Sequence, residues 1–205
     1  MSKKSSIPQK IKDYLDKHKA EYEELVHKTV YTAYDAAQTL KKDLKEVAKN
    51  LLIQADKTYA LVVVPADKRI DLKKLKKALG AKKVSLPKED VIVKVLKIKP
   101  GVISSFGKLH KVETWIDQAM LGTKKVVFST GSATNSVLMK VKDFVQLEEA
   151  KLADIAMKGG YKISKPVKKA MSKVKAKVKL KKKITVVKAK KVFKKFKKIN
   201  KKYGF

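Results

Sequence analysis

The uneven distribution of charge constrains the fold of this chain more than any other feature. Residues 158–205 contain 21 lysines and no aspartate or glutamate, whereas the residues before them carry 31 basic and 19 acidic side chains. A segment with so much like charge cannot bury enough apolar surface to fold alone. Gly159 and Gly160 interrupt any helix that approaches this boundary. We therefore expect one folded domain over residues 1–157, and a lysine-rich extension over residues 158–205 that is disordered or partly helical when free.

The extension has two regular patterns among its lysines. Residues 173–181 alternate lysine with apolar side chains, as in a strand, and residues 192–199 place apolar side chains at helical spacing. Repulsion among the lysines favours a polyanionic partner, and a phosphate backbone supplies one. RNA is the partner that we expect, with an anionic membrane surface, or charge without a specific partner, as the alternatives. The lysines that we predict to contact nucleic acid are Lys181, Lys182, Lys183, Lys190, Lys191, Lys194 and Lys195.

The rest of the composition excludes several classes of site. The chain has no cysteine, which excludes disulfides, thiolate metal sites and a cysteine nucleophile. It shows no metal-ligand cluster, no phosphate-binding glycine loop and no serine-hydrolase motif. It also lacks an apolar run long enough to cross a membrane, and a signal-peptide pattern at its start. We therefore expect a soluble, cytoplasmic protein without a metal site.

Hydrophobic periodicity predicts a mixed α/β domain before the extension. Thr32 and Asp71 are placed to cap helices, and Gly80 is placed to end one. One predicted helix begins near Ser6, and four more cover residues 32–40, 72–80, 87–96 and 142–157. The predicted strands cover residues 22–27, 47–54, 58–66, 82–86, 113–117, 124–131 and 136–141. The short connections between strands favour a largely antiparallel or mixed sheet.

One strand carries a lysine where an apolar residue is expected. The alternation over residues 47–54 puts Val47, Lys49, Leu51 and Ile53 on one face. A lysine that faces a core costs free energy unless a partner compensates it. The side chain either reaches solvent, pairs with a carboxylate, or meets an anionic ligand such as the 3′ end of a nucleic acid.

The central part of the chain resembles a known family. The stretches "VAKNLLIQAD", "YALVVVPADKRIDLKKLKKALGAKKVSL", "KPGVISSFG", "TWID" and "VVFSTGSATNSVLMKVKDFVQL" resemble the YbaK/EbsC-type prolyl-tRNA synthetase-associated domain, over residues 7–150. The resemblance implies a mixed, partly barrel-like sheet wrapped by helices. It implies a hydrolase that deacylates, in trans, tRNA mischarged with a small amino acid such as alanine, cysteine, serine or threonine. It implies no metal or organic cofactor.

The resemblance also assigns roles to residues. Lys49 falls where the family keeps a functional lysine, and Gly131 and Ser132 fall in its second glycine loop, so these three residues form the predicted catalytic set. The predicted substrate-binding residues are His27, Gly101, Val102, Ile103, Phe106 and Gly107. In the implied mechanism, a terminal ribose hydroxyl helps to activate water, Lys49 orients the substrate, and loop amides at 101–103 and 131–132 bind the oxyanion. The implied partner is the aminoacylated 3′ end of tRNA, with a synthetase or translation factors as further partners.

The chain departs from the family pattern in both loops. Many relatives have proline where this chain has Ser105, and some have histidine where Ala133, Thr134 and Asn135 stand. These departures leave open a second hypothesis, a non-enzymatic tRNA- or RNA-binding protein that retains the fold. Asp117, beside the tryptophan of "TWID", we interpret as structural.

Overall fold

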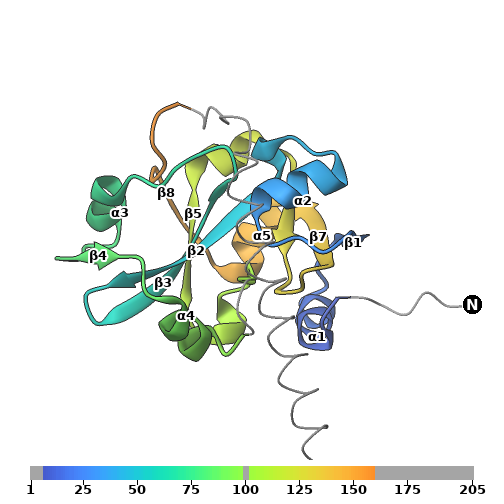
Figure 1. Ribbon diagram of the computed structural model, residues 1–205, viewed down its shortest axis with the longest axis horizontal. Coiled ribbons are helices and arrows are strands. Elements are labelled where there is room, and N and C mark those ends of the chain that lie inside the picture. Colours follow the sequence, from blue (N-terminus) through green and yellow to red (C-terminus); the bar gives the residue numbers. More distant parts are fainter. Residues whose placement is uncertain (1–6, 99–101, 160–205) are drawn as a thin grey trace, which may run out of the picture. The chain divides into compact units, whose positions relative to one another are not determined.

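The computed structural model describes residues 7–98 and 102–159, which form a mixed α/β fold (Figure 1). Within these residues there are five α-helices and two sheets, so the predicted fold class is confirmed at this level. Gly101 and the seven tail lysines predicted to bind nucleic acid lie outside the described residues, and so does Ser6. The domain boundary at residue 157 stays a prediction.

The smaller sheet is antiparallel and holds three strands. Its order is β1 (Tyr22–Val26), β7 (Asn135–Lys140) and β6 (Lys125–Ser129). In this register Val26 pairs with Asn135, and Ser129 pairs with Ser136. The start of β7 therefore lies between the end of β1 and the end of β6.

The larger sheet is mixed and holds five strands. Its order is β4 (Val84–Ser85), β2 (Ala48–Ala55), β3 (Thr58–Pro65), β5 (Glu113–Asp117) and β8 (Lys151–Ala153). β2 pairs antiparallel with β3 and β4, whereas β3–β5 and β5–β8 are parallel. Val47 and Val127 form a parallel bridge between the two sheets. The partly barrel-like sheet that the resemblance implied is therefore wrong in detail, because the described strands form two sheets and no closed barrel.

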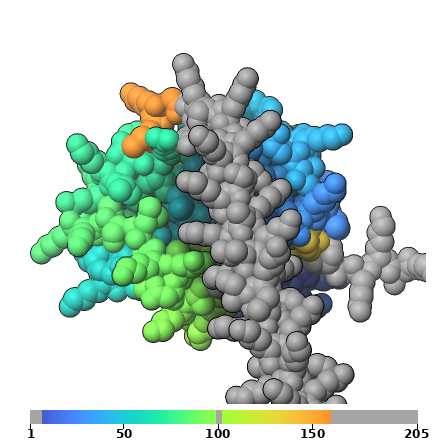
Figure 2. Space-filling model, viewed as in Figure 1, coloured from blue at the N-terminus to red at the C-terminus, as the bar shows by residue number. Residues whose placement is uncertain are grey.

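Five helices pack around these sheets: α1 (Gln9–Lys17), α2 (Ala33–Leu40), α3 (Leu72–Ala78), α4 (Glu89–Leu96) and α5 (Val141–Glu148). Short 3-10 turns cover η1 (Leu44–Glu46), η2 (Lys108–His110) and η3 (Gln118–Gly122). Helices α3 and α4 lie at one side of the domain, and α1 and α2 lie at the other (Figures 1 and 2). None of the helices in the described ranges has the length and apolarity to cross a membrane.

Predicted caps explain where two helices begin. The Thr32 hydroxyl accepts a hydrogen bond from the Asp35 amide at 3.0 Å, as expected for an N-cap. The Asp71 carboxylate accepts from the amides of Lys73 and Lys74, and it fixes the start of α3 in the same way. The first helix begins after Pro8, and no side chain caps its first turn.

The predicted helix over residues 142–157 is wrong in its second half. Helix α5 ends at Glu148, because Glu149 adopts a left-handed backbone with φ of 47°. The chain then forms β8, which pairs with β5. One carboxylate oxygen of Asp117, at the end of β5, accepts hydrogen bonds from the amides of Ile155 (2.9 Å) and Ala156 (2.7 Å). These tertiary contacts outweigh the helical pattern, and Asp117 has the structural role that we predicted.

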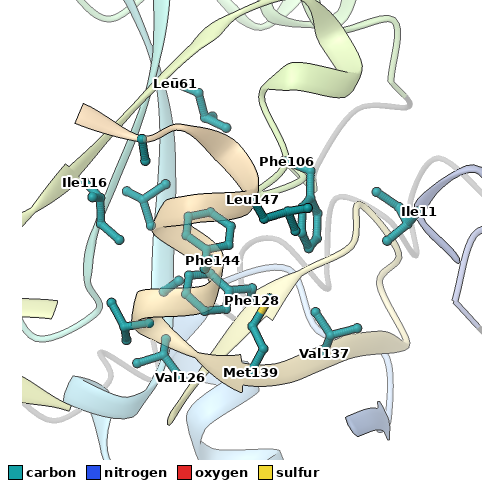
Figure 3. Close-up of a cluster of buried hydrophobic side chains, with 14 of the residues drawn as sticks. Ile11, Leu61, Phe106, Ile116, Val126, Phe128, Val137, Met139, Phe144 and Leu147 are labelled. Atoms are coloured by element: carbon teal, nitrogen blue, oxygen red, sulfur yellow. The ribbon is translucent and has the colours of Figure 1, made fainter. Parts of the chain in front are cut away.

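The main core lies between the two sheets and α5. Phe128 and Phe144 stack with ring centroids 4.0 Å apart, and Phe106 meets Phe144 edge-on (Figure 3). All three rings are fully buried. Val47 packs with Val127 of the smaller sheet in a second cluster, so the start of β2 lies at the border between the sheets.

Candidate functional site

A cavity of about 250 Å³ opens beside the start of β2. It lies among the N-terminal end of α2, the loop after α4, the end of β6 and the start of β7. Its apolar lining includes Val30, Ala33, Ala36, Val47, Ile103 and Val127, and its polar lining includes Lys49, Asn50, Ser129, Ser132 and Ser136. Among the described residues that line it, only Lys49 carries a charge. The cavity can therefore hold a small, largely apolar group next to one cation.

Lys49 is half-buried and is one of the residues that line this cavity. The Nζ atom donates a hydrogen bond to the carbonyl oxygen of Lys68, in the turn after β3. Burial lowers the pKa of the Lys49 amine; the nearby charge of Asp67 opposes that shift, and Arg69 adds to it. Lys49 thus contributes to the cavity wall, while its amine is hydrogen-bonded to the turn after β3.

Asp67 is the carboxylate that balances Lys49 most directly. Its Oδ1 atom is buried and has no hydrogen-bond partner among the described residues. A carboxylate oxygen in this condition is costly to bury, because it has lost its water without gaining a donor. Asp67 is close enough to Lys49 for the two charges to attract each other.

Ser105 ties the loop after α4 to both sheets. Its hydroxyl donates to Asn50 Oδ1 at 3.1 Å and accepts from the Ser129 amide at 3.0 Å. Its own amide donates to the Ser129 carbonyl at 2.8 Å, a bond that proline cannot make. Asn50 Nδ2 donates in turn to the Ile103 carbonyl at 3.0 Å. The serine that stands in place of the family proline therefore anchors the loop through partly buried hydrogen bonds.

Hydroxyl groups organise the second loop. The backbone of Gly131 has a φ of 80°, which favours glycine, and a Cβ atom there would lie 3.5 Å from Ser104. The hydroxyls of Ser132 and Thr134 both donate to Asn135 Oδ1, at 3.1 and 2.8 Å. Asn135 Nδ2 is buried without a partner among the described residues. The residues that stand where some relatives have histidine thus form a polar network, in which Asn135 Nδ2 is a hydrogen-bond donor that no described residue uses.

His27 lies one hydrogen bond away from the cavity. Its Nε2 atom is 3.0 Å from the hydroxyl of Ser136, which lines the cavity, and its Nδ1 atom is 2.9 Å from the Lys28 carbonyl. Because the Lys28 carbonyl only accepts, Nδ1 carries the proton, and Nε2 accepts from Ser136. His27 therefore orients a cavity hydroxyl.

The structure brings together part of the predicted site. Lys49, Val102, Ile103 and Ser132 line the cavity, and Gly131 is next to Ser132 in the chain. Phe106 lies in the core instead, where it packs against Phe144 and Tyr14.

Gly107 also lies away from the cavity. A Cβ atom there would come within 2.3 Å of Thr114 Oγ1 and 2.7 Å of the Val112 carbonyl, so this glycine permits close packing.

Sequence reasoning missed Asn50, Tyr31 and Ser136. Asn50 follows Lys49 directly, and that adjacency was the available signal for it. Tyr31 and Ser136 gave no signal, because they reach the cavity only through the fold.

The comparisons with known proteins find similar sequences over the part of the chain that contains the cavity. The model of the aminoacyl-tRNA editing domain matches residues 27–147, which include the cavity. The chain is 30% identical over 142 residues to the prolyl-tRNA editing protein ProX of Acetoanaerobium sticklandii, covering 66% of this chain and 87% of that protein. It is 26% identical over 91 residues to the proline–tRNA ligase of Macrococcus caseolyticus, covering 44% of this chain and 16% of the ligase.

A solved structure supports the fold. The structure named "putative trans-editing enzyme for prolyl tRNA synthetase" has a TM-score of 0.66 and 19% identity, over 75% of this chain and 99% of that one. Together with the domain match over more than half of the sequence, these similarities establish the family. The chain belongs to the aminoacyl-tRNA editing domain family, the YbaK/ProX deacylases.

Proposed function

We propose that this protein acts in trans to hydrolyse the ester of tRNA mischarged with a small amino acid of the alanine, serine, cysteine or threonine class. The observation that carries the proposal is a small, mostly apolar cavity within an editing-family domain, in which Lys49 is the one charged residue among the described lining residues. A cavity of about 250 Å³ is smaller than sites that enclose drug-sized ligands, so it favours small side chains. A second site that admits only small side chains can remove wrong amino acids that the aminoacylation site of a synthetase fails to reject.

The chemistry needs few protein groups. An aminoacyl ester is already reactive, so the enzyme has to position water and stabilise the developing oxyanion. The positive charge of Lys49 orients the ester or the terminal nucleotide, and a terminal ribose hydroxyl helps to activate the water. The amides of Gly131 and Ser132 donate to neighbouring hydroxyls at 3.2 and 3.4 Å. A charged oxyanion would be a stronger acceptor than these hydroxyls, so the amides can turn to it during the reaction.

The basic tail has a separate role in this proposal. Its lysines raise affinity for the tRNA backbone, and the cavity supplies selectivity for the amino acid. Support for the tail comes from its charge, 21 lysines without a carboxylate over residues 158–205. The cytoplasm is the compartment that fits an enzyme with this substrate.

The test is a deacylation panel. Full-length protein is incubated with alanyl-, seryl-, cysteinyl- and threonyl-tRNA, and the loss of the amino acid is followed with parent and Lys49→Ala protein. The proposal expects turnover of at least one small aminoacyl-tRNA and a loss of about 10²–10³-fold in the variant. Salt-sensitive tRNA binding without turnover by the parent would instead support the non-enzymatic RNA-binding hypothesis.

A further inference from the structure

Tyr31 is an exposed aromatic residue at the rim of the cavity. It lines the cavity, yet 69% of its surface is accessible. Aromatic side chains usually bury most of their area, so a large exposed ring beside a ligand cavity is informative. The neighbouring Val30 is buried and belongs to a core cluster, so the chain is packed against the domain directly before Tyr31.

The backbone on both sides of Tyr31 is anchored. The Val30 amide donates to the Ala133 carbonyl at 2.8 Å, and the Thr32 hydroxyl caps α2 by accepting from Asp35. The exposed ring therefore projects from a segment held by hydrogen bonds before and after it. The backbone that carries the ring is therefore already ordered at the rim, which lowers the entropy lost when the ring binds a flat ligand.

The size of the cavity leaves the terminal base outside. About 250 Å³ accommodates an aminoacyl group and part of a sugar, but it is below the range of pockets that enclose drug-sized ligands. The base of the 3′-terminal nucleoside must therefore sit at the rim when the ester is near Lys49. Tyr31 belongs to that rim.

We propose that the Tyr31 ring stacks on the 3′-terminal base of the aminoacylated nucleic acid and so holds the ester in the cavity beside Lys49. This inference rests on the proposed function, because it takes an aminoacylated 3′ end as the ligand. Stacking between a base and an aromatic side chain contributes about 1–3 kcal/mol and tolerates any base. Tyr31 would then be a binding residue that adds affinity without selecting the amino acid.

The test uses binding, so that it is independent of turnover. The probe is a short single-stranded RNA whose 3′-terminal adenosine carries an alanyl group through a non-hydrolysable amide. A second probe has the same phosphates and alanyl amide, but its terminal sugar lacks a base. Dissociation constants of both probes are measured by fluorescence anisotropy with the full chain, at a salt concentration that suppresses binding through phosphates alone.

The expected result is a loss of binding affinity that depends on the presence of the terminal base. Tyr31→Ala and Tyr31→Leu weaken binding of the adenosine probe at least about fivefold, and they leave the abasic probe within about twofold. Tyr31→Phe and Tyr31→Trp bind both probes like the parent. Val26→Ala is the matched control, since Val26 is 70% exposed and does not line the cavity, and it should change neither constant.

Two outcomes overturn the inference. One is equal weakening of both probes by Tyr31→Ala, which would mean that the ring contacts the sugar or the amino acid. The other is unchanged binding of the adenosine probe by both Tyr31→Ala and Tyr31→Leu. If the deacylation panel shows no turnover while the base-dependent loss remains, the proposed function fails and the role of Tyr31 stands. If turnover is seen without that loss, the proposed function stands and the role of Tyr31 fails.

Discussion

Under the proposed function, Lys49 opposes stability and serves the site. The amine lies half-buried beside an apolar lining, where its charged form is disfavoured. The Lys68 carbonyl and the charge of Asp67 recover part of that loss. An apolar residue of similar length would pack in the same place without a charge to desolvate. The arrangement is therefore expected to favour binding at the expense of some stability.

Lys49→Met should separate these two effects. We expect the variant to lose deacylation by about 10²–10³-fold, while its melting temperature at pH 7 equals or exceeds that of the parent. A folded-state pKa below the ordinary value for lysine means that the charged amine destabilises the fold below that pKa. The destabilisation fades as the pH rises toward 10.5, the ordinary value. The gain from methionine should therefore shrink between pH 7 and pH 10 in thermal melts, and a gain that grows would contradict the burial argument.

Ser105 is the residue-scale test of the loop. Ser105→Ala removes the hydroxyl that joins Asn50 to the Ser129 amide, and it should cost about 1–3 kcal/mol of unfolding free energy. Ser105→Pro restores the common family residue but also removes the amide that donates to the Ser129 carbonyl. We expect the proline variant to be the less stable of the two in urea titrations. Deacylation should fall in both, mainly in kcat, because the loop shifts beside Lys49. A proline variant as stable as the parent would mean that the loop has a second good conformation.

At the scale of elements, a buried carboxylate fixes the end of α5. Glu148 accepts hydrogen bonds from the Tyr14 hydroxyl, the Lys108 amide and the Thr114 hydroxyl, each at 3.0 Å. Burial raises the pKa of Glu148, although these three donors act in the opposite direction. The helix end is thus joined to α1, to η2 and to β5 through a single side chain.

Glu148→Gln should change the pH dependence of stability. Because the folded-state pKa is raised, the parent is most favoured below about pH 4.5, the ordinary value for glutamate, and loses stability as the pH rises through the folded pKa. Glutamine can keep the bonds to Lys108 and Thr114, and the Tyr14 hydroxyl can donate to the Leu147 carbonyl, 3.1 Å away. We expect the difference in melting temperature between variant and parent to move in favour of the variant from pH 4 to pH 8. A constant difference would show that Glu148 does not titrate differently in the folded state.

The same region shows why element boundaries are hard to predict. The periodicity of residues 142–157 suits a single helix, and α5 indeed begins there. The helix stops because the next residues gain more from joining β5 and from donating to Asp117. Both partners are more than 30 residues earlier in the chain, so a local pattern cannot reveal them.

At the scale of the whole molecule, charge is the dominant feature. The chain has a net charge of +33, and the lysine-rich extension supplies 21 of its 52 basic residues. Binding of tRNA by the full chain should therefore depend steeply on salt, because each neutralised phosphate releases counterions.

Truncation after Gly159 should isolate that effect. In plots of log Kd against log salt, we expect the slope to become shallower by about 0.7–0.9 for each phosphate that the tail neutralises in the full chain. Hydrolysis at saturating substrate should be retained, because the cavity lies entirely before the truncation. Equal slopes for both proteins would contradict a role of the tail in binding.

The sequence by itself determined the family and most helices and strands, and it predicted Lys49 as a site residue. Those conclusions rest on local patterns: alternation along β2, capping residues before α2 and α3, and motifs at short spacing. Only the tertiary structure decided which predicted residues share a cavity. It placed Phe106 in the core and Tyr31 at the rim, it divided the sheet in two, and it turned the end of a predicted helix into β8. The physical reason is that burial and hydrogen-bond partners depend on segments far apart in the chain, whereas periodicity and capping depend on neighbours.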